Sequence, residues 1–153
     1  MAIFKPYDIR GVYPKEINES IVYKIGKLIP KILKCKNIVI GYDIRLSSKE
    51  LFNSLVKALF EENVEVTSIN ECTTPMLYFS SFHYKFDAAI MITASHLGKN
   101  FNGLKICTKD AVVLGYNNLG KYLEKEINND FKENKINKKI KYLNIKEDYE
   151  DFI

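Results

Sequence analysis

The chain has 153 residues, which is enough for one domain with a buried core and helices on both faces of a sheet. It has 46% hydrophobic and 27% charged residues and no run of about 18 apolar residues, so it reads as a globular protein without a membrane span. The net charge of +4 is modest, and the lysines of residues 132–141 lack the interleaved aromatic residues typical of a nucleic-acid face. Neither a membrane nor a nucleic acid is therefore expected as a partner.

The cysteines and the first residues predict a cytoplasmic protein. Cys35, Cys72 and Cys107 are odd in number and widely spaced, as in proteins whose thiols stay reduced. Charged residues begin at Lys5, which leaves no room for the apolar part of a secretory signal.

The first third of the chain predicts a strand, a helix and a second strand. Residues 9–13 suit a short strand in which a glycine allows a close approach of backbone or ligand. Asn18 is typical of a helix cap, and apolar residues follow it at helical spacing. Pro30 is expected to kink that helix or end it early. Residues 37–42 suit a buried strand, and residues 43–46 are the loop at its carboxyl end.

The next segment predicts a well-bounded helix. Residues 47–50 read Ser-Ser-Lys-Glu, a capping-box pattern in which Ser47 is the cap and the Glu50 side chain reaches back to it. Apolar residues then recur at helical spacing through Phe60, and Asn63 can close the helix. We therefore expect a helix that buries one apolar face.

Strands and helices continue to alternate along the rest of the chain. The expected elements are a strand at 64–69, a helix from a Thr74 cap and Pro75 to about residue 84, an apolar strand at 86–92, a strand at 104–108 and a last helix capped by Asn117 or Asn118. This alternation predicts an α/β fold with a doubly wound, mainly parallel but mixed sheet and helices on both faces. The loops after the first strand and after the strands at 37–42 and 86–92 would share the edge where such sheets bind ligands. Arg10, Arg45 and Ser95 would then lie close together.

Arginine is rare in this chain. Of its 23 basic residues only Arg10 and Arg45 are arginine, and each stands in the tetrapeptide Tyr-Asp-Ile-Arg. In so lysine-rich a sequence, arginine is expected where lysine cannot replace its planar fork of donors, as in binding a phosphate or carboxylate through two bonds. The alternative is a pair of ordinary Asp–Arg ion pairs.

The last residues predict a strand and then a helix that is cut short. Residues 140–145 suit the strand, and residues 148–153 begin an amphipathic helix with Tyr149, Phe152 and Ile153 on one face. A helix of so few residues has little to hold it. We expect residues 1–145 to form one domain and residues 146–153 to start a linker or next domain of a longer protein.

The segment from Thr93 to Lys105 carries the chemistry. It reads Thr-Ala-Ser-His, five further residues and Asn-Gly-Leu-Lys, between two strands. The Ser95–His96 pair by itself is a weak signal, because adjacent residues rarely form a hydrolase triad and no Gly-x-Ser-x-Gly elbow is present. The whole pattern strongly resembles the catalytic loop of the α-D-phosphohexomutases. Three further segments resemble the phosphomannomutase/phosphoglucomutase branch of that family: residues 4–11, 41–48 and 73–75.

The resemblance implies a role for each polar residue of the loop and its surroundings. Ser95 would be the phosphoserine, which gives its phosphate to a hexose phosphate. The bisphosphorylated sugar would then reorient in the site, and the serine would recover a phosphate from the other position of the sugar. His96, Lys105 and Arg10 match positions that surround the phosphoserine and assist proton transfer. The supports of the loop and of the substrate would be Arg45, Thr93, Asn102 and Asp43.

The resemblance also implies partners and a cofactor. The chain would be the first of four domains of an isomerase of carbohydrate metabolism, active as the full-length protein, with the isolated fragment inactive. Mg²⁺ would bind the phosphate on Ser95 and take its other ligands from another domain, and a hexose 1,6-bisphosphate would act as activator. A hexose phosphate and the remaining domains of its own chain are the expected partners.

One departure and three alternatives accompany this interpretation. Most family members continue Asn-Pro after the histidine, whereas Leu97 and Gly98 follow His96 here, and the glycine should make the loop more flexible. A phosphoglucosamine mutase domain and a non-enzymatic phosphate-binding module of the same fold are alternatives. A flavodoxin-like nucleotide or flavin binder is disfavoured, because no glycine-rich phosphate loop follows the first strand.

Overall fold

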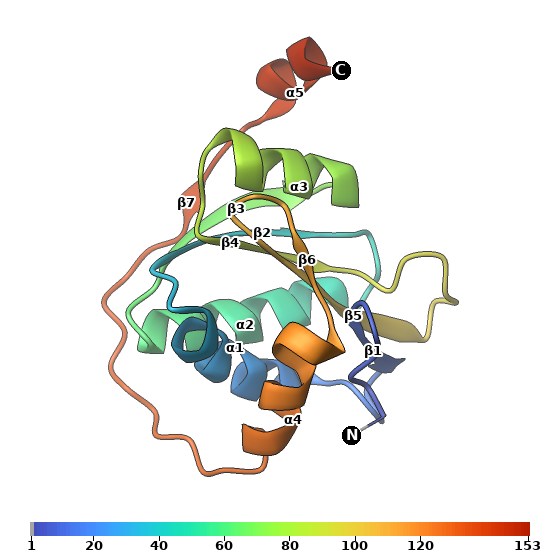
Figure 1. The fold of residues 1–153 in the computed structure, drawn as a ribbon, viewed down its shortest axis with the longest axis vertical. Coiled ribbons are helices and arrows are strands. Elements are labelled where there is room, and N and C mark those ends of the chain that lie inside the picture. The colour runs from blue at the N-terminus through green and yellow to red at the C-terminus, as the bar shows by residue number, and fades with distance from the viewer. Residues whose placement is uncertain (1) are drawn as a thin grey trace.

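The computed structural model describes residues 2–153, in which seven strands form one mixed sheet in the order β1-β5-β4-β2-β3-β7, with β6 added on β5 (Figure 1). The strands are β1 (Ile9–Val12), β2 (Asn37–Tyr42), β3 (Glu65–Glu71), β4 (Ala88–Ile92), β5 (Phe101–Thr108), β6 (Val113–Leu114) and β7 (Lys141–Tyr142). The strands β4, β2, β3 and β7 run parallel, whereas β5 is antiparallel to β1, β4 and β6. The predicted α/β class with a mixed sheet is confirmed.

Helices cover both faces of this sheet, as predicted (Figure 1). One face carries α1 (Glu19–Leu33), α2 (Ser48–Glu61) and α4 (Lys121–Glu126), which continues a short π-helix, η1 (Tyr116–Gly120). The other face carries α3 (Thr74–His83). The last helix, α5 (Lys146–Phe152), packs the rings of Tyr149 and Phe152 against Phe79 of α3. No helix within residues 2–153 is both long enough and apolar enough to cross a membrane.

Side-chain alternation along the strands sorts the core into two layers. In β2, Ile38 and Ile40 belong to the layer with α1 and α2, whereas Val39 belongs to the layer with α3. In β4, Ile90 and Met91 divide in the same way. Both strands are buried on both faces, which accounts for the nearly continuous apolar runs that predicted them.

Helix α1 begins where the sequence predicts but does not end early at its proline. Asn18 caps it by accepting a backbone N–H at 3.0 Å. Pro30 lies inside the helix, which continues three residues beyond it, so the expected early end is wrong. The helix packs closely on α2 along its length. Gly26 allows that packing, because a Cβ there would lie 2.7 Å from the Cβ of Ala58.

The predicted capping box of α2 is not formed. Ser47 is the cap residue, but its side chain makes no capping bond. The Ser47 hydroxyl instead accepts a hydrogen bond from Asn102 at 2.8 Å. The side-chain amide of Asn102 is fully buried and must donate to acceptors within the protein. The Ser47 hydroxyl is one of these acceptors and does not cap the helix.

Other element ends also differ from their sequence signals. The cap of α3 is Thr73 rather than Thr74. The helical segment made of η1 and α4 starts after Gly115, so the expected capping asparagines, at 117 and 118, lie inside η1. Glycine is required there because a Cβ would lie 1.8 Å from the carbonyl oxygen of Pro6. The strand expected at 140–145 is reduced to β7, which pairs with β3 over two residues.

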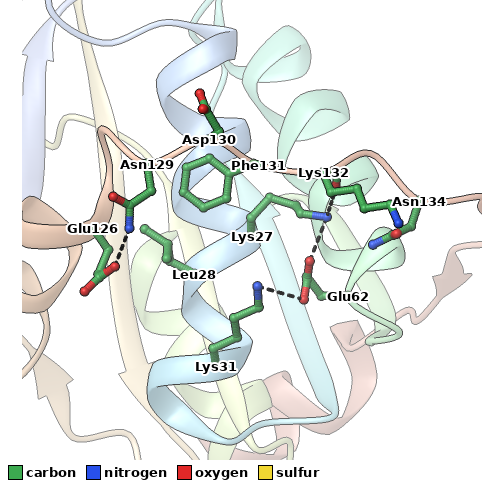
Figure 2. A pocket seen from close by; sticks show the side chains of 10 residues that line it. All are labelled: Lys27, Leu28, Lys31, Glu62, Glu126, Asn129, Asp130, Phe131, Lys132 and Asn134. Carbon is green, nitrogen blue, oxygen red and sulfur yellow. Dashed lines mark hydrogen bonds and ion pairs between the residues drawn. The ribbon is translucent and has the colours of Figure 1, made fainter.

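Between α4 and β7 the chain forms an extended strap, residues 128–140, which passes around the outside of α1 and α2 (Figure 1). Lys27 of α1 anchors it by donating to the Lys132 carbonyl at 2.9 Å (Figure 2). The Lys27 ammonium also pairs with Glu61 at 3.2 Å and Glu62 at 2.7 Å. Lys27 is 1% exposed, and a charge so buried is tolerated only with such partners. A cleft of about 450 Å³ remains between the strap and the helices.

Candidate active site

The carboxyl ends of β2 and β4 lie side by side because these strands pair in parallel. The loops that follow them line an open cleft of about 960 Å³. The first residues of α3 and Met91 of β4 complete its wall. The polar residues that line the cleft are Asp43, Arg45, Thr73, Thr74, Thr93, Ser95, Lys99 and Asn100. The edge at which the sequence predicts ligand binding therefore has a cleft, and both Arg45 and Ser95 line it.

Ser95 stands in the turn after β4 in a left-handed conformation, with φ of 55°. A residue with a side chain adopts this conformation at a cost of about 1 kcal/mol, so its surroundings must hold it there. The Ser95 N–H donates to Thr93 Oγ1 at 3.0 Å, and the Ser95 carbonyl accepts from Arg45 Nη2 at 2.9 Å. Both backbone groups of Ser95 are fixed, while its side chain is exposed beside the cleft.

Arg45 uses all five of its side-chain N–H groups within the protein. Its Nε donates to Asp43 Oδ2 at 3.0 Å. Its two terminal nitrogens donate to four main-chain carbonyls of the loop, those of Ser95, Leu97, Gly98 and Phe101, at 2.7 to 3.1 Å. The guanidinium therefore has no N–H left for an anion, and its geometry is that of a clamp on the loop.

A network of hydrogen bonds among polar side chains holds Asp43, the carboxylate partner of Arg45, in place. Asp43 Oδ1 accepts from the Ser48 hydroxyl at 2.6 Å and from the Arg45 backbone N–H at 3.1 Å. Asn102 Nδ2 donates to the Ser48 hydroxyl at 3.0 Å and to the Ser47 hydroxyl at 2.8 Å. Ser48 and Asn102 are fully buried. Sequence reasoning assigned Ser47 to a helix cap and gave Ser48 no role, although both lie within the segment 41–48 that resembles the family.

Arg10 and Lys105 lie on the neighbouring strands and share one carboxylate. Asp8 Oδ1 is 2.8 Å from Arg10 Nε, and Asp8 Oδ2 is 3.1 Å from Lys105 Nζ. Arg10 pairs in register with Gly103, whose carbonyl accepts the Thr93 N–H at 3.0 Å. The register thus places Arg10 at the sheet edge that leads into the Ser95 turn. Sequence reasoning did not single out Asp8, although the repeated Tyr-Asp-Ile-Arg tetrapeptide was a signal for it.

His96 follows Ser95 directly and is exposed. Within residues 2–153 the structure shows no hydrogen bond or ion pair of its imidazole. The structure thus brings Thr93 and Arg45 into direct contact with the Ser95 backbone. It places Arg10 and Lys105 on adjoining strands and His96 beside the serine in solvent.

Cys72 also lines the cleft, with its sulfur 3.7 Å from that of Met91. Burial raises the pKa of its thiol to about 12, so the thiol is protonated at neutral pH. Because the thiolate is the reactive form, Cys72 is a poor nucleophile here. The side chain of Ser95, in contrast, is exposed beside the cleft.

Comparison with known proteins adds independent findings. A family model described as phosphoglucomutase/phosphomannomutase, alpha/beta/alpha domain I, matches residues 1–138. Over 111 residues the chain is 40% identical to a phosphomannomutase of Klebsiella pneumoniae, which covers 72% of this chain and 71% of that protein. Over 114 residues it is 38% identical to a phosphomannomutase of Methanocaldococcus jannaschii, of which it covers 25%.

A solved structure shows the same fold. The structure of a phosphoglucomutase/phosphomannomutase family protein from Burkholderia thailandensis superposes with a TM-score of 0.78 at 24% identity, covering 97% of this chain and 34% of that one. The chain thus spans a quarter to a third of these longer relatives.

Proposed function

The chain belongs to the phosphoglucomutase/phosphomannomutase family as its alpha/beta/alpha domain I, and from this premise we propose that Ser95 carries phosphate in an isomerase of hexose phosphates. The observation that carries the proposal is the geometry of Ser95. Thr93 and Arg45 fix both of its backbone groups, and its side chain is exposed beside the cleft. We further propose that residues 1–145 are the domain and residues 146–153 the start of a linker or next domain, with the activity belonging to a full-length protein.

The proposed reaction moves one phosphoryl group out and another back. A hydroxyl of the hexose monophosphate attacks the phosphorus of phosphorylated Ser95, the bond between phosphorus and the serine oxygen breaks, and the hydroxyl proton passes to a base. The bisphosphorylated sugar then reorients in the cleft, so that its two phosphoryl groups exchange places. Its other phosphoryl group moves to Ser95, which returns the enzyme to its starting state and releases the isomeric monophosphate.

The charge of the proposed phosphoserine needs cationic neighbours. A serine phosphate holds about −1.5 to −2 charges at neutral pH. Arg10 and Lys105 are the candidates for these cationic neighbours, because the terminal N–H groups of Arg45 are already hydrogen-bonded to carbonyls of the loop. We assign proton transfer to His96, which stands next to the serine and has no competing partner among the described residues.

The family uses Mg²⁺, which when bound neutralises charge on a transferring phosphoryl group. Among residues 2–153 no three His, Cys, Asp or Glu side chains come close enough together to hold a metal ion. The carboxylate beside the loop, that of Asp43, is already bonded to Ser48 and Arg45. These residues alone do not fit a metal site. We propose the Ser95 phosphate as one ligand, with the others from outside this chain, and a hexose 1,6-bisphosphate as activator.

Phosphate mapping on the full-length protein tests the proposal. Intact-mass measurement and peptide mapping of freshly purified protein should find a phosphate on Ser95, and a hexose monophosphate should remove it as the bisphosphate. Ser95→Ala should abolish nearly all turnover and keep the melting temperature, because an exposed hydroxyl contributes little to stability.

Ser20→Ala removes an exposed hydroxyl from α1 and should keep wild-type turnover. The 153-residue chain alone should show no turnover in a coupled assay with mannose or glucose 1-phosphate, Mg²⁺ and a bisphosphate activator. Phosphate on a different residue, or wild-type turnover of Ser95→Ala, would rule out the mechanism.

A further inference from the structure

The two copies of Tyr-Asp-Ile-Arg make the same local pair. In each, the Nε of the arginine meets the carboxylate two residues earlier, at 3.0 Å for Arg45 with Asp43 and 2.8 Å for Arg10 with Asp8. The terminal nitrogens differ. Those of Arg45 bind four carbonyls, whereas for those of Arg10 the structure shows no partner anywhere in residues 2–153.

The free nitrogens of Arg10 are open to solvent. Every buried side-chain nitrogen and oxygen in the described part of the chain has a hydrogen-bond partner. The two unpartnered nitrogens of Arg10 are therefore not buried, in keeping with a side chain that is 29% exposed. Four N–H groups remain in a planar fork, the arrangement that matches two oxygens of a phosphate.

Asp8 joins this fork to a second cation. Its other oxygen holds Lys105 Nζ at 3.1 Å, and its own side chain is only 5% exposed. Lys105 lies opposite Met91 in the β4–β5 register, and Met91 lines the cleft. Side chains directly opposite one another on paired strands share a face of the sheet, so Lys105 lies on the cleft side.

A glycine of the neighbouring strand β5 provides the space for this cluster. Arg10 lies across from Gly103, and a Cβ on that glycine would be 3.1 Å from Arg10 Cγ and 2.0 Å from the Ile9 carbonyl oxygen. The Arg10 side chain thus lies over a position without a side chain. One carboxylate and two cations meet here, with a net charge of +1.

We propose that Asp8 is a positioning residue that holds Arg10 and Lys105 together as a cradle for a phosphate dianion. The inference rests on the proposed function for the identity of the anion, a phosphate monoester on Ser95 or on the substrate. It adds that the acidic residue of the cluster serves anion binding, although its own charge opposes the anion.

Because the charge of Asp8 opposes the anion, the proposal predicts the direction in which the dissociation constant changes when that charge is removed. If Asp8 acted through charge alone, Asp8→Asn would raise the local charge from +1 to +2 and tighten anion binding. If Asp8 positions the cations, its loss frees the guanidinium and the ammonium, and binding weakens despite the extra positive charge. The two accounts predict opposite changes in the same dissociation constant.

The experiment is a titration of the 153-residue chain with inorganic phosphate, followed by nuclear magnetic resonance. The chain has only two arginines, so the Nε–H region contains two signals, and Arg10→Lys assigns them. In the wild type, phosphate should shift the Arg10 signal and leave the Arg45 signal in place as an internal control. Asp8→Asn should weaken binding by about fivefold, because the contacts that hold Arg10 and Lys105 are both released and the added positive charge offsets only part of that loss.

Two further variants separate position from charge. Asp110→Asn adds the same net charge at an exposed turn and should leave the dissociation constant unchanged. Asp8→Glu keeps every charge but displaces the carboxylate by one methylene, and it should also weaken binding. It serves as the test if Asp8→Asn does not fold. Tighter binding in Asp8→Asn, wild-type binding in Asp8→Glu or no shift of the Arg10 signal would overturn the proposal.

The experiments distinguish failure of this inference from failure of the proposed function. A phosphate-free Ser95 in the full-length protein would refute the mutase mechanism and leave the cradle intact. A phosphorylated Ser95 together with unchanged phosphate binding in the Asp8 variants would do the reverse.

Discussion

At the scale of single residues, the environment of each guanidinium decides what an arginine does. Arg45 faces a turn whose carbonyls point inward, and it binds four of them. Arg10 faces a glycine on the next strand and leaves its terminal nitrogens open to solvent. The same tetrapeptide therefore supplies a structural clamp in one place and a candidate anion ligand in the other.

Replacing each arginine by lysine should separate these roles. Arg45→Lys should lower the free energy of unfolding by about 2 kcal/mol, because one ammonium cannot reach four carbonyls and the aspartate together. Arg10→Lys, the matched control, should cost less than about 1 kcal/mol, since lysine can still pair with a carboxylate. Urea titrations of both variants measure the difference. Equal losses would contradict the assignment of Arg45 as the clamp.

The sequence indicates only part of this site. The buried strand at 86–92 and the loop after it could be predicted, and so could the meeting of Arg45 and Ser95 at one edge, because strand periodicity and parallel pairing follow from local pattern. The roles of Asp8 and Ser48 could not. Both depend on contacts with side chains of β5, Lys105 for Asp8 and Asn102 for Ser48, which lie about 50 to 100 residues away in the sequence.

At the scale of elements, β5 connects the two halves of the site. It pairs with β1 on one side and β4 on the other, and at Gly103 the backbone of β1 leaves no room for a Cβ. A side chain there would collide with the backbone of β1. The Asn-Gly-Leu-Lys segment therefore needs its glycine for strand packing, apart from any role in chemistry.

Two glycine substitutions test this requirement. Gly103→Ala should lower the free energy of unfolding by about 3 kcal/mol, because its Cβ would lie 2.0 Å from the Ile9 carbonyl oxygen and force β1 away. Gly98→Ala meets no atom within 4 Å and should leave stability unchanged or raise it by about 0.5 kcal/mol. Thermal unfolding of the pair gives the comparison. A neutral Gly103→Ala would show that β1 is not held against β5 in this register.

Helices were easier to predict than their ends. The apolar spacing of α1 and α2 located both, because burial of one face dominates helix stability in a protein. Helix α3 was located by the start signal of Thr74 and Pro75. The cap of α2 was mistaken because the Ser47 hydroxyl serves a buried asparagine from β5. The run at 140–145 was assigned too long a strand, because only two of its residues find β3. Tertiary partners that local pattern does not show decided each of these ends.

At the scale of the whole molecule, the charges under the strap tie α1, α2 and residues 128–140 into one unit. Burial by itself would raise the pKa of Glu61, but the hydrogen bonds from Tyr23 and Lys27 and the nearby lysine charges outweigh it and hold the pKa below its usual range. A carboxyl with a lowered folded-state pKa stabilises the fold above its unfolded pKa of about 4.3. That stabilisation is lost as the pH falls through the folded-state pKa.

The acid sensitivity of Glu61 can be isolated by substitution. At neutral pH Glu61→Gln should be less stable than the wild type, and this difference should shrink as the pH falls from about 5 to about 3. Glu147→Gln, at an exposed position on α5, should follow the wild-type curve. Chemical unfolding at several pH values measures both. A constant gap between wild type and Glu61→Gln would mean that Glu61 titrates alike in the folded and unfolded chains.

The reaction rate of the three cysteine thiols measures how readily the folded molecule opens. Burial raises the pKa of Cys72 to about 12 and the pKa of Cys35 and Cys107 to about 11. At pH 8 the native protein should therefore react with a thiol reagent at least about tenfold more slowly than the unfolded chain does. Absorbance after mixing with Ellman's reagent, with and without urea, gives both rates. Rapid reaction of Cys72 alone would show that the cleft wall opens separately from the core.

The anchor between Lys27 and the Lys132 carbonyl joins residues 105 positions apart, and this separation has a consequence for the newly made chain. At the usual speed of synthesis, roughly 5 to 20 s pass between the emergence of the first residue and that of the second. Until then Lys27 and its two glutamates lie at a hydrated surface, and α1 and α2 already have the partners that form their layer. The strap can close only over a helix pair that is already in place, so the contact that removes water from the buried charges forms after the helices that carry those charges.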